Sequence, residues 1–163
     1  LSPANVYGRQ KLEMEQCVLD ACPDAVLLRA TWMYDLPGYG LPIRGNLPMN
    51  LAKAALYGGK VRVSSRDYRG ITYVRQAVEN LLPATALPGG VYNYGSENQY
   101  DMVTTARAFA EAMQLPNADT LIEAADWPRN LAMDCAKLHG HGIRFDATQD
   151  GIYRCLRDYG LIK

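Results

Sequence analysis

Residues 7–30 read YGRQKLEMEQCVLDACPDAVLLRA, and this stretch decides the fold. Apolar residues recur in its first part at three- and four-residue spacing, which predicts a helix over residues 7–21 that ends at a turn around Pro23. Residues 25–30 are almost all apolar, which is typical of a strand buried on both faces. A helix followed directly by such a strand favours an α/β fold with a parallel sheet.

Apolar spacing and the positions of glycine and proline predict the remaining elements. Residues 36–48 contain three prolines and three glycines, so we expect a long loop there, and loops of that length are more often functional than idle. We expect another irregular stretch over residues 66–72 and an ordered segment around residues 134–138. Helices are expected at residues 49–57, 74–82, 101–113 and 148–159, and strands at residues 61–64 and 90–94.

The composition excludes several classes of protein. Seventeen basic and 17 acidic side chains give a formal net charge of zero, which indicates neither a nucleic acid nor a membrane surface as partner. No apolar run is long enough to span a membrane, and no basic stretch leads into an apolar segment at the start. The four cysteines form no C-x-x-C pair, so we expect reduced thiols and a cytoplasmic location. Because the first residue is leucine and no strand precedes the first helix, we expect a fragment.

Tyr7 and Lys11 form a Tyr-x-x-x-Lys pair at the start of the first predicted helix. They are four positions apart in the sequence, so both side chains share one helix face with Glu15. A nearby cation favours the phenolate and helps a tyrosine to exchange protons at neutral pH. Such a short motif also arises by chance, and the alternative is a surface tyrosine beside a Lys11–Glu15 pair.

Five segments, in order along the chain, carry a resemblance to a known family. They read NVYGRQKLEME, LRATWMY, RDYRGITYV, GVYNYG and WPRNLAMDCAKL, and begin at residues 5, 28, 66, 90 and 127. Each is similar to a segment of the dTDP-4-dehydrorhamnose reductases, which are extended short-chain dehydrogenases/reductases. The resemblance implies that residues 1–163 form the later part of a Rossmann-type parallel sheet with a small mixed α/β substrate-binding subdomain.

The resemblance also implies roles for particular residues. The family reduces a 4-keto nucleotide sugar, dTDP-4-dehydro-L-rhamnose, with NADPH or NADH. Tyr7 would protonate the keto oxygen as hydride arrives, and Lys11 would favour the phenolate and hold the nicotinamide ribose. Trp32 would lie against the sugar, while Arg29 and Arg69 would contact the substrate. The alternatives are a core aromatic for Trp32 and a structural ion pair for Arg29.

Some positions depart from the family's pattern. Gln10 replaces a serine or threonine, and Met14 replaces a glycine. Tyr68 replaces a glutamine and Trp127 an arginine, in segments expected to line the nucleotide-sugar site. The identity of the base and of the sugar therefore stays open.

A glycine-rich phosphate-binding turn is missing from the sequence. A dinucleotide site needs such a turn between a strand and a helix, and no G-x-G-x-x-G occurs. The family's third catalytic residue, a serine or threonine, lies further upstream of the tyrosine than this chain extends. We expect a missing N-terminal part to supply most of the NADP(H) or NAD(H) site. The 163 residues alone should neither bind NADPH tightly nor turn over.

Two other functions stay open. The oligomeric state also stays open, and a homodimer is one alternative. The NAD-dependent epimerases and dehydratases of the same superfamily share the Tyr-x-x-x-Lys helix. Some proteins of this fold are non-catalytic regulatory subunits, such as the one that binds methionine adenosyltransferase. A metal site is not expected, because His139 and His141 flank a glycine with no third ligand at a recognisable spacing.

Overall fold

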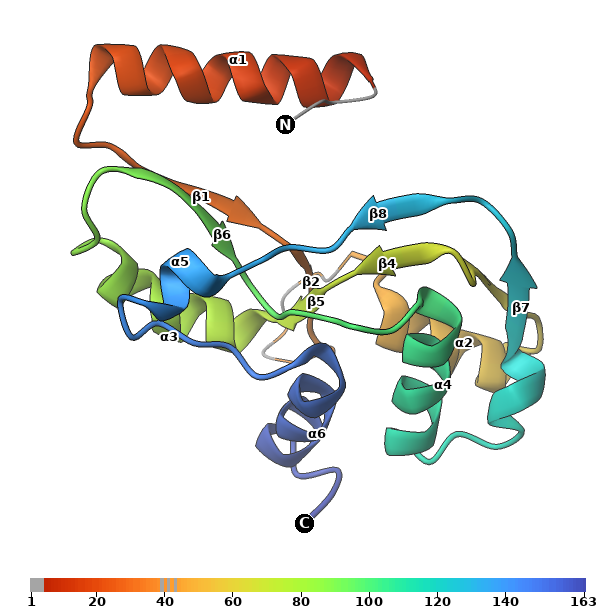
Figure 1. The fold of residues 1–163 in the computed structure, drawn as a ribbon. Helices are drawn as coiled ribbons and strands as arrows, with labels where there is room; N and C mark the ends of the chain where they lie inside the picture. Colours follow the sequence, from red (N-terminus) through yellow and green to blue (C-terminus); the bar gives the residue numbers. More distant parts are fainter. Residues whose placement is uncertain (1–4, 39, 41, 43) are drawn as a thin grey trace.

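The computed structural model describes residues 5–38, 40, 42 and 44–163, and Figure 1 shows their arrangement. The helices are α1 (Val6–Ala21), α2 (Leu47–Tyr57), α3 (Val74–Ala84), α4 (Met102–Ala112), α5 (Ala136–His139) and α6 (Thr148–Asp158), with a short 3-10 helix, η1, at Ala118–Leu121. The strands are β1 (Val26–Ala30), β2 (Trp32–Tyr34), β3 (Val61–Ser64), β4 (Asp67–Arg69), β5 (Ile71–Tyr73), β6 (Gly90–Tyr94), β7 (Ile122–Ala125) and β8 (Arg129–Leu131).

The parallel pairing predicted from the first stretch is confirmed. Strand β1 runs parallel to β6, with Val26 opposite Gly90 and Ala30 opposite Tyr94. The expectation of a strand buried on both faces is wrong, because β1 is only half-buried. Figure 1 shows α3 and α5 on one side of this strand pair and α1 on the other. None of the residues of α1 is buried, so this helix shields its side of β1 incompletely.

The irregular stretch expected over residues 66–72 is also a wrong prediction. Strand β4 pairs in parallel with β8, and β5 pairs in parallel with β2. Both partners are distant in sequence, and Gly70 divides the segment into two runs of three residues. Such short runs have no recognisable alternation, so only the tertiary pairing makes them strands. Strand β3 was predicted correctly, while its partner β7 was not anticipated.

The helix ends follow local capping. Helix α2 begins two residues earlier than predicted, because the Asn46 side chain accepts a hydrogen bond from the Met49 backbone N–H at 3.1 Å. The expected helix at residues 101–113 is present as α4, and Asp101 is its N-cap. The expected loop at residues 36–48 precedes α2, and its residues 39, 41 and 43 lie outside the described part of the chain.

Two hydrophobic clusters hold these elements. The larger joins β2, β5, α2, α4 and α6, and Phe109 is fully buried in it with Tyr34 packed edge-on at 5.3 Å between ring centroids. The smaller joins α3, β6 and α5 around Tyr92 and Leu138. Trp32 lies two residues before Tyr34 of the larger cluster, so the strand that follows β1 is anchored in this core.

Gly70 provides a test of the close approach between β4–β5 and the segment after β6. A Cβ at this position would lie 1.8 Å from the Ser96 carbonyl oxygen. We expect Gly70→Ala to lower the free energy of unfolding by about 1–3 kcal/mol, because the backbone must move to relieve the overlap. Urea denaturation measures this loss.

The matched control is Gly140→Ala, whose added Cβ would meet its nearest atom at 3.4 Å. That change should alter stability by less than about 0.5 kcal/mol. A Gly70→Ala protein as stable as this control would contradict the packing described.

Candidate functional site

Helix α1 places Tyr7 and Lys11 side by side. Asn5 caps the helix, accepting a hydrogen bond from the Gly8 backbone N–H at 2.8 Å. One turn into the helix, Lys11 Nζ lies 5.5 Å from the centroid of the Tyr7 ring. Tyr7 is 69% exposed, so its hydroxyl is accessible to a molecule bound beside the helix.

Glu15 attaches this helix to β1 through Arg29. The Arg29 guanidinium donates two hydrogen bonds to the Glu15 carboxylate, one of them from Nε at 2.7 Å. These hydrogen bonds hold the pKa of Glu15 below its ordinary value and raise that of Arg29. Arg29 therefore forms a structural ion pair, which was the alternative to its contact with substrate. The partner of Glu15 is Arg29 and not Lys11. A substrate contact by Arg29 stays a prediction.

A cavity of about 490 Å³ opens beside Tyr7, and we call it the Tyr7 cavity. It lies where β1, β4 and β8 meet the first turn of α1. Four of the five predicted site residues line it. The fifth, Lys11, does not line the cavity but lies next to Tyr7. The lining residues are Tyr7, Arg29, Ala30, Thr31, Trp32, Arg69, Gly70, Asn93, Asn130, Leu131, Ala132 and Met133.

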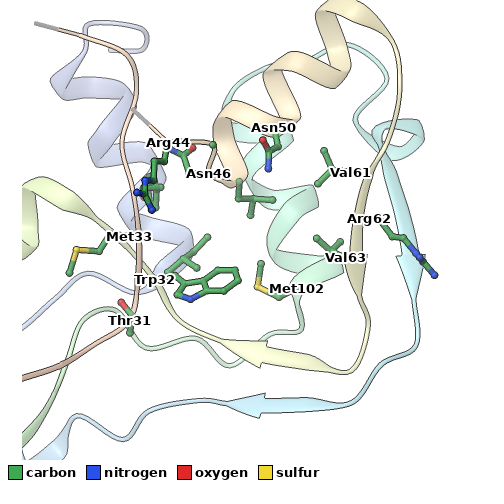
Figure 2. Close-up of a pocket in the computed structure, with 14 residues that line it drawn as sticks. Thr31, Trp32, Met33, Arg44, Asn46, Asn50, Val61, Arg62, Val63 and Met102 are labelled. Atoms are coloured by element: carbon green, nitrogen blue, oxygen red, sulfur yellow. The ribbon is translucent and has the colours of Figure 1, made fainter. Parts of the chain in front are cut away.

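Trp32 separates this cavity from a larger one of about 760 Å³, which we call the Asn46 cavity. Figure 2 shows the Trp32 indole beside Met102 at one side of it, with Asn46 and Asn50 on the other side. Trp32 is 65% exposed, so the prediction of a ring available to a ligand fits better than the alternative of a core aromatic. Trp32 thus lines both cavities.

Arg69 lies against Trp32, with its Cζ 4.1 Å from the centroid of the indole. Its side chain is 4% exposed and forms a bidentate ion pair with Asp67. Arg69 therefore lines the Tyr7 cavity while it packs against the Trp32 ring. A contact between Arg69 and the substrate stays a prediction.

Sequence reasoning missed several lining residues. Asn93 and Asn130 line the Tyr7 cavity, and the Asn93 side chain donates to the Asp134 carbonyl at 2.8 Å. Asn46 and Asn50 line the second cavity. The available signal was topological, since Asn93 lies near the carboxyl end of a parallel strand, where sites of α/β proteins gather.

The other chemically active side chains have structural surroundings. His141 packs edge-on against Tyr92, with 5.8 Å between ring centroids. Over the part of the chain that the structure describes, no three His, Cys, Asp or Glu residues group as metal ligands. Burial raises the pKa of the Cys135 thiol to about 11 and that of Cys155 to about 12, so both are protonated at neutral pH. Within the same described ranges, no helix is both long and apolar enough to cross a membrane.

The Glu15–Arg29 pair predicts a dependence of stability on pH. Folding lowers the pKa of Glu15. The contribution of this carboxylate to stability is therefore complete above the pKa of about 4.3 in the unfolded chain, and it disappears as pH falls through the lower pKa of the folded chain. We expect Glu15→Gln to cost about 0.2–1 kcal/mol at neutral pH, as for partly exposed ion pairs, and nothing at strongly acidic pH. Urea unfolding at several pH values measures this.

Glu13→Gln, an exposed change on the same helix, is the control and should leave the pH dependence as in the wild type. An equal loss for Glu15→Gln at neutral and at acidic pH would show that the ion pair does not stabilise α1 on β1.

Comparisons with known proteins identify relatives of this chain. The family described as "RmlD substrate binding domain" matches residues 1–160. A dTDP-4-dehydrorhamnose reductase of Mycobacterium tuberculosis (strain ATCC 25618 / H37Rv) is 30% identical over 131 residues, which cover 78% of this chain and 41% of the relative. The methionine adenosyltransferase 2 subunit beta of Danio rerio is 24% identical over 162 residues, covering 90% of this chain and 49% of the relative. The chain spans about half the length of these curated relatives.

Solved structures show the same fold. The dTDP-4-dehydrorhamnose reductase of Bacillus anthracis, solved in complex with NADP, superposes with a TM-score of 0.78 at 17% identity. That match covers 96% of this chain and 55% of the other. The dTDP-glucose 4,6-dehydratase of the same organism, solved with NAD, has a TM-score of 0.69 at 17% identity over 98% of this chain and 53% of that one. The predicted α/β fold with parallel strands of the Rossmann type is confirmed.

Proposed function

The chain belongs to the RmlD substrate binding domain family, and from this premise we propose that it forms the substrate-facing half of a nucleotide-sugar reductase. The intact enzyme would reduce a 4-keto nucleotide sugar, dTDP-4-dehydro-L-rhamnose, to the corresponding alcohol with NADPH or NADH. The observation that carries the proposal is the Tyr7 cavity, which places a solvent-accessible phenol, a neighbouring ammonium group and an exposed indole around one space.

The residues of this chain account for the proton and for the orientation of the sugar. Tyr7 donates its phenolic proton to the keto oxygen, and Lys11 stabilises the phenolate that remains. The exposed face of Trp32 covers the apolar face of the sugar ring and holds the carbonyl toward Tyr7. The nicotinamide cofactor, when bound, supplies the hydride. Tyr7 and Lys11 are the residues here that would hold its nicotinamide ribose, because both are exposed and their polar groups lie on the same face of α1.

The nucleotide is assigned to the Asn46 cavity. This cavity adjoins the Tyr7 cavity through Trp32 and is the larger of the two, as a base and ribose require. Amide groups of Asn46 and Asn50 supply donors and acceptors, and Arg44 supplies positive charge for a diphosphate. In the intact protein a dinucleotide-binding part would complete the site. A cytoplasmic location and a homodimer stay predictions of the sequence.

A second function is supported by the relatives named as methionine adenosyltransferase 2 subunit beta. Their match extends over nearly the whole of this chain, further than that of the M. tuberculosis reductase. The protein would then act as a regulatory subunit of a methionine adenosyltransferase. The presence of both Tyr7 and Lys11 favours the reductase.

One experiment tests the reductase against its alternatives. The intact protein is incubated with NADPH and a panel of dTDP- and UDP-linked 4-keto sugars, and separately with NAD⁺ and the corresponding 4-hydroxy sugars, and the products are identified by NMR. The reductase proposal predicts a 4-hydroxy sugar with consumption of NADPH. An isomerised or dehydrated sugar with no net cofactor consumption would support an epimerase or dehydratase. No turnover, together with retention on an immobilised methionine adenosyltransferase, would support the regulatory subunit.

A further inference from the structure

We propose that Asp67 is a positioning residue that orients Trp32 through Arg69. The orientation of the ring follows from contacts within this chain, whereas its kinetic consequence rests on the nucleotide-sugar site proposed above. Asp67 lies in the RDYRGITYV segment that carries the resemblance, but the sequence indicated no role for it.

The ion pair fixes the plane of the Arg69 guanidinium. Asp67 and Arg69 are two residues apart on β4, so both side chains project from the same face of the strand. Arg69 Nε donates to one carboxylate oxygen of Asp67 at 3.0 Å, and Nη2 donates to the other at 2.8 Å. Two parallel hydrogen bonds restrict rotation of the guanidinium in a way that a single contact cannot.

The pair is not explained by stability alone. The side chains are 4% and 9% exposed, and burying two charges costs about as much as their attraction returns. In addition, Nη1 of Arg69 is buried without a hydrogen-bond partner among the described residues, which is a further cost. A buried pair with an unsatisfied donor is expected where orientation matters more than stability.

The fixed guanidinium supports one face of Trp32. Its Cζ lies 4.1 Å from the centroid of the indole, well within the range of a cation–π contact. Trp32 nonetheless remains 65% exposed and lines both the Tyr7 cavity and the Asn46 cavity. Without support, an exposed indole would sample several rotamers, and ordering it on binding would cost affinity. Asp67 and Arg69 therefore hold the common wall of both cavities in place before the ligand arrives.

The test uses two readouts on the full-length protein. In protein labelled with 5-fluorotryptophan, the ¹⁹F resonance of Trp32 is identified by its loss in Trp32→Phe. We expect Asp67→Asn to move this resonance toward that of free 5-fluorotryptophan, because the ring loses its ordered neighbour. We also expect KM for the nucleotide sugar to rise about tenfold and kcat to fall by a smaller factor, because Trp32 both binds the sugar ring and holds its carbonyl toward Tyr7.

A neighbouring ion pair supplies the control. Arg66 and Asp126 lie 3.4 Å apart with both side chains more than half exposed. Asp126→Asn removes a charge close to β4 without touching the Arg69 guanidinium, and it should leave both the Trp32 resonance and KM as in the wild type.

A second variant covers the case in which Asp67→Asn does not fold. Arg69→Lys keeps the charge next to Asp67 but lacks the planar fork, so the Trp32 resonance and KM should change as for Asp67→Asn. Folded variants with a lower melting temperature but an unchanged Trp32 resonance and KM would overturn the proposal. A shifted Trp32 resonance in a protein that turns over no nucleotide sugar would support the positioning role and refute the proposed function.

Discussion

Replacing Tyr7 by phenylalanine in the intact enzyme is expected to lower kcat by about two or more orders of magnitude, the usual effect of removing a positioned general acid. The change deletes one hydroxyl from a residue that is 69% exposed at the cavity, so the helix and its ion pair to β1 stay intact. Circular dichroism and the melting temperature should match the wild type. Steady-state kinetics with NADPH and the keto sugar measure the loss.

Tyr153→Phe is the matched control. Tyr153 is a partly exposed tyrosine on α6 and lies outside both cavities. Its substitution should leave kcat unchanged. If the Tyr7 variant turned over at close to the wild-type rate, Tyr7 would not be the proton donor and the assignment of the site would be wrong.

The second large effect is a loss of stability, expected from a change in the larger hydrophobic cluster, which contains Tyr34 of β2. Phe109 is fully buried and packs against Tyr34, which follows Trp32 on β2. We expect Phe109→Ala to lower the free energy of unfolding by about 3–5 kcal/mol, because the change removes a large apolar side chain and leaves a cavity. That is a large share of the total stability of a typical domain, about 5–15 kcal/mol. Denaturant unfolding measures the loss.

The exposed Leu82 on α3 provides the comparison, since its side chain is 79% exposed. Leu82→Ala should change stability by less than about 0.5 kcal/mol. Similar losses for the two variants would mean that the cluster of β2, α4 and α6 does not form the principal core.

The long helices and the strands β1 and β6 were predictable because their signals are local. The apolar spacing of α1 and the continuous apolar run of β1 identified both elements and indicated a parallel sheet, although not that β6 is the partner of β1. The pairs β4–β8 and β2–β5 were not predictable, because each strand has three residues and a partner far away in sequence. The surface exposure of α1 was also missed, since spacing shows which face of a helix is apolar and not what covers it.

In the candidate site, too, local signals were predictive and contacts between distant segments were not. The Tyr7–Lys11 neighbourhood follows from helical spacing alone, and the structure places the two side chains together as expected. Trp32 was identified only through a resemblance, and nothing local indicated that Arg69 would stack on its ring. No role was predicted for Asp67, because an ion pair between residues two positions apart is recognisable only once β4 is known to be a strand.

We propose above that the Tyr7 cavity serves a net reduction of a 4-keto nucleotide sugar. The most direct measurement supplies the intact enzyme with dTDP-4-dehydrorhamnose and NADPH deuterated at the transferred position, then locates the label by NMR. We predict one NADPH oxidised for each sugar consumed, with deuterium at C4 of the product. An unlabelled product, or consumption of the sugar without net oxidation of NADPH, would show that the site does not reduce the sugar at C4.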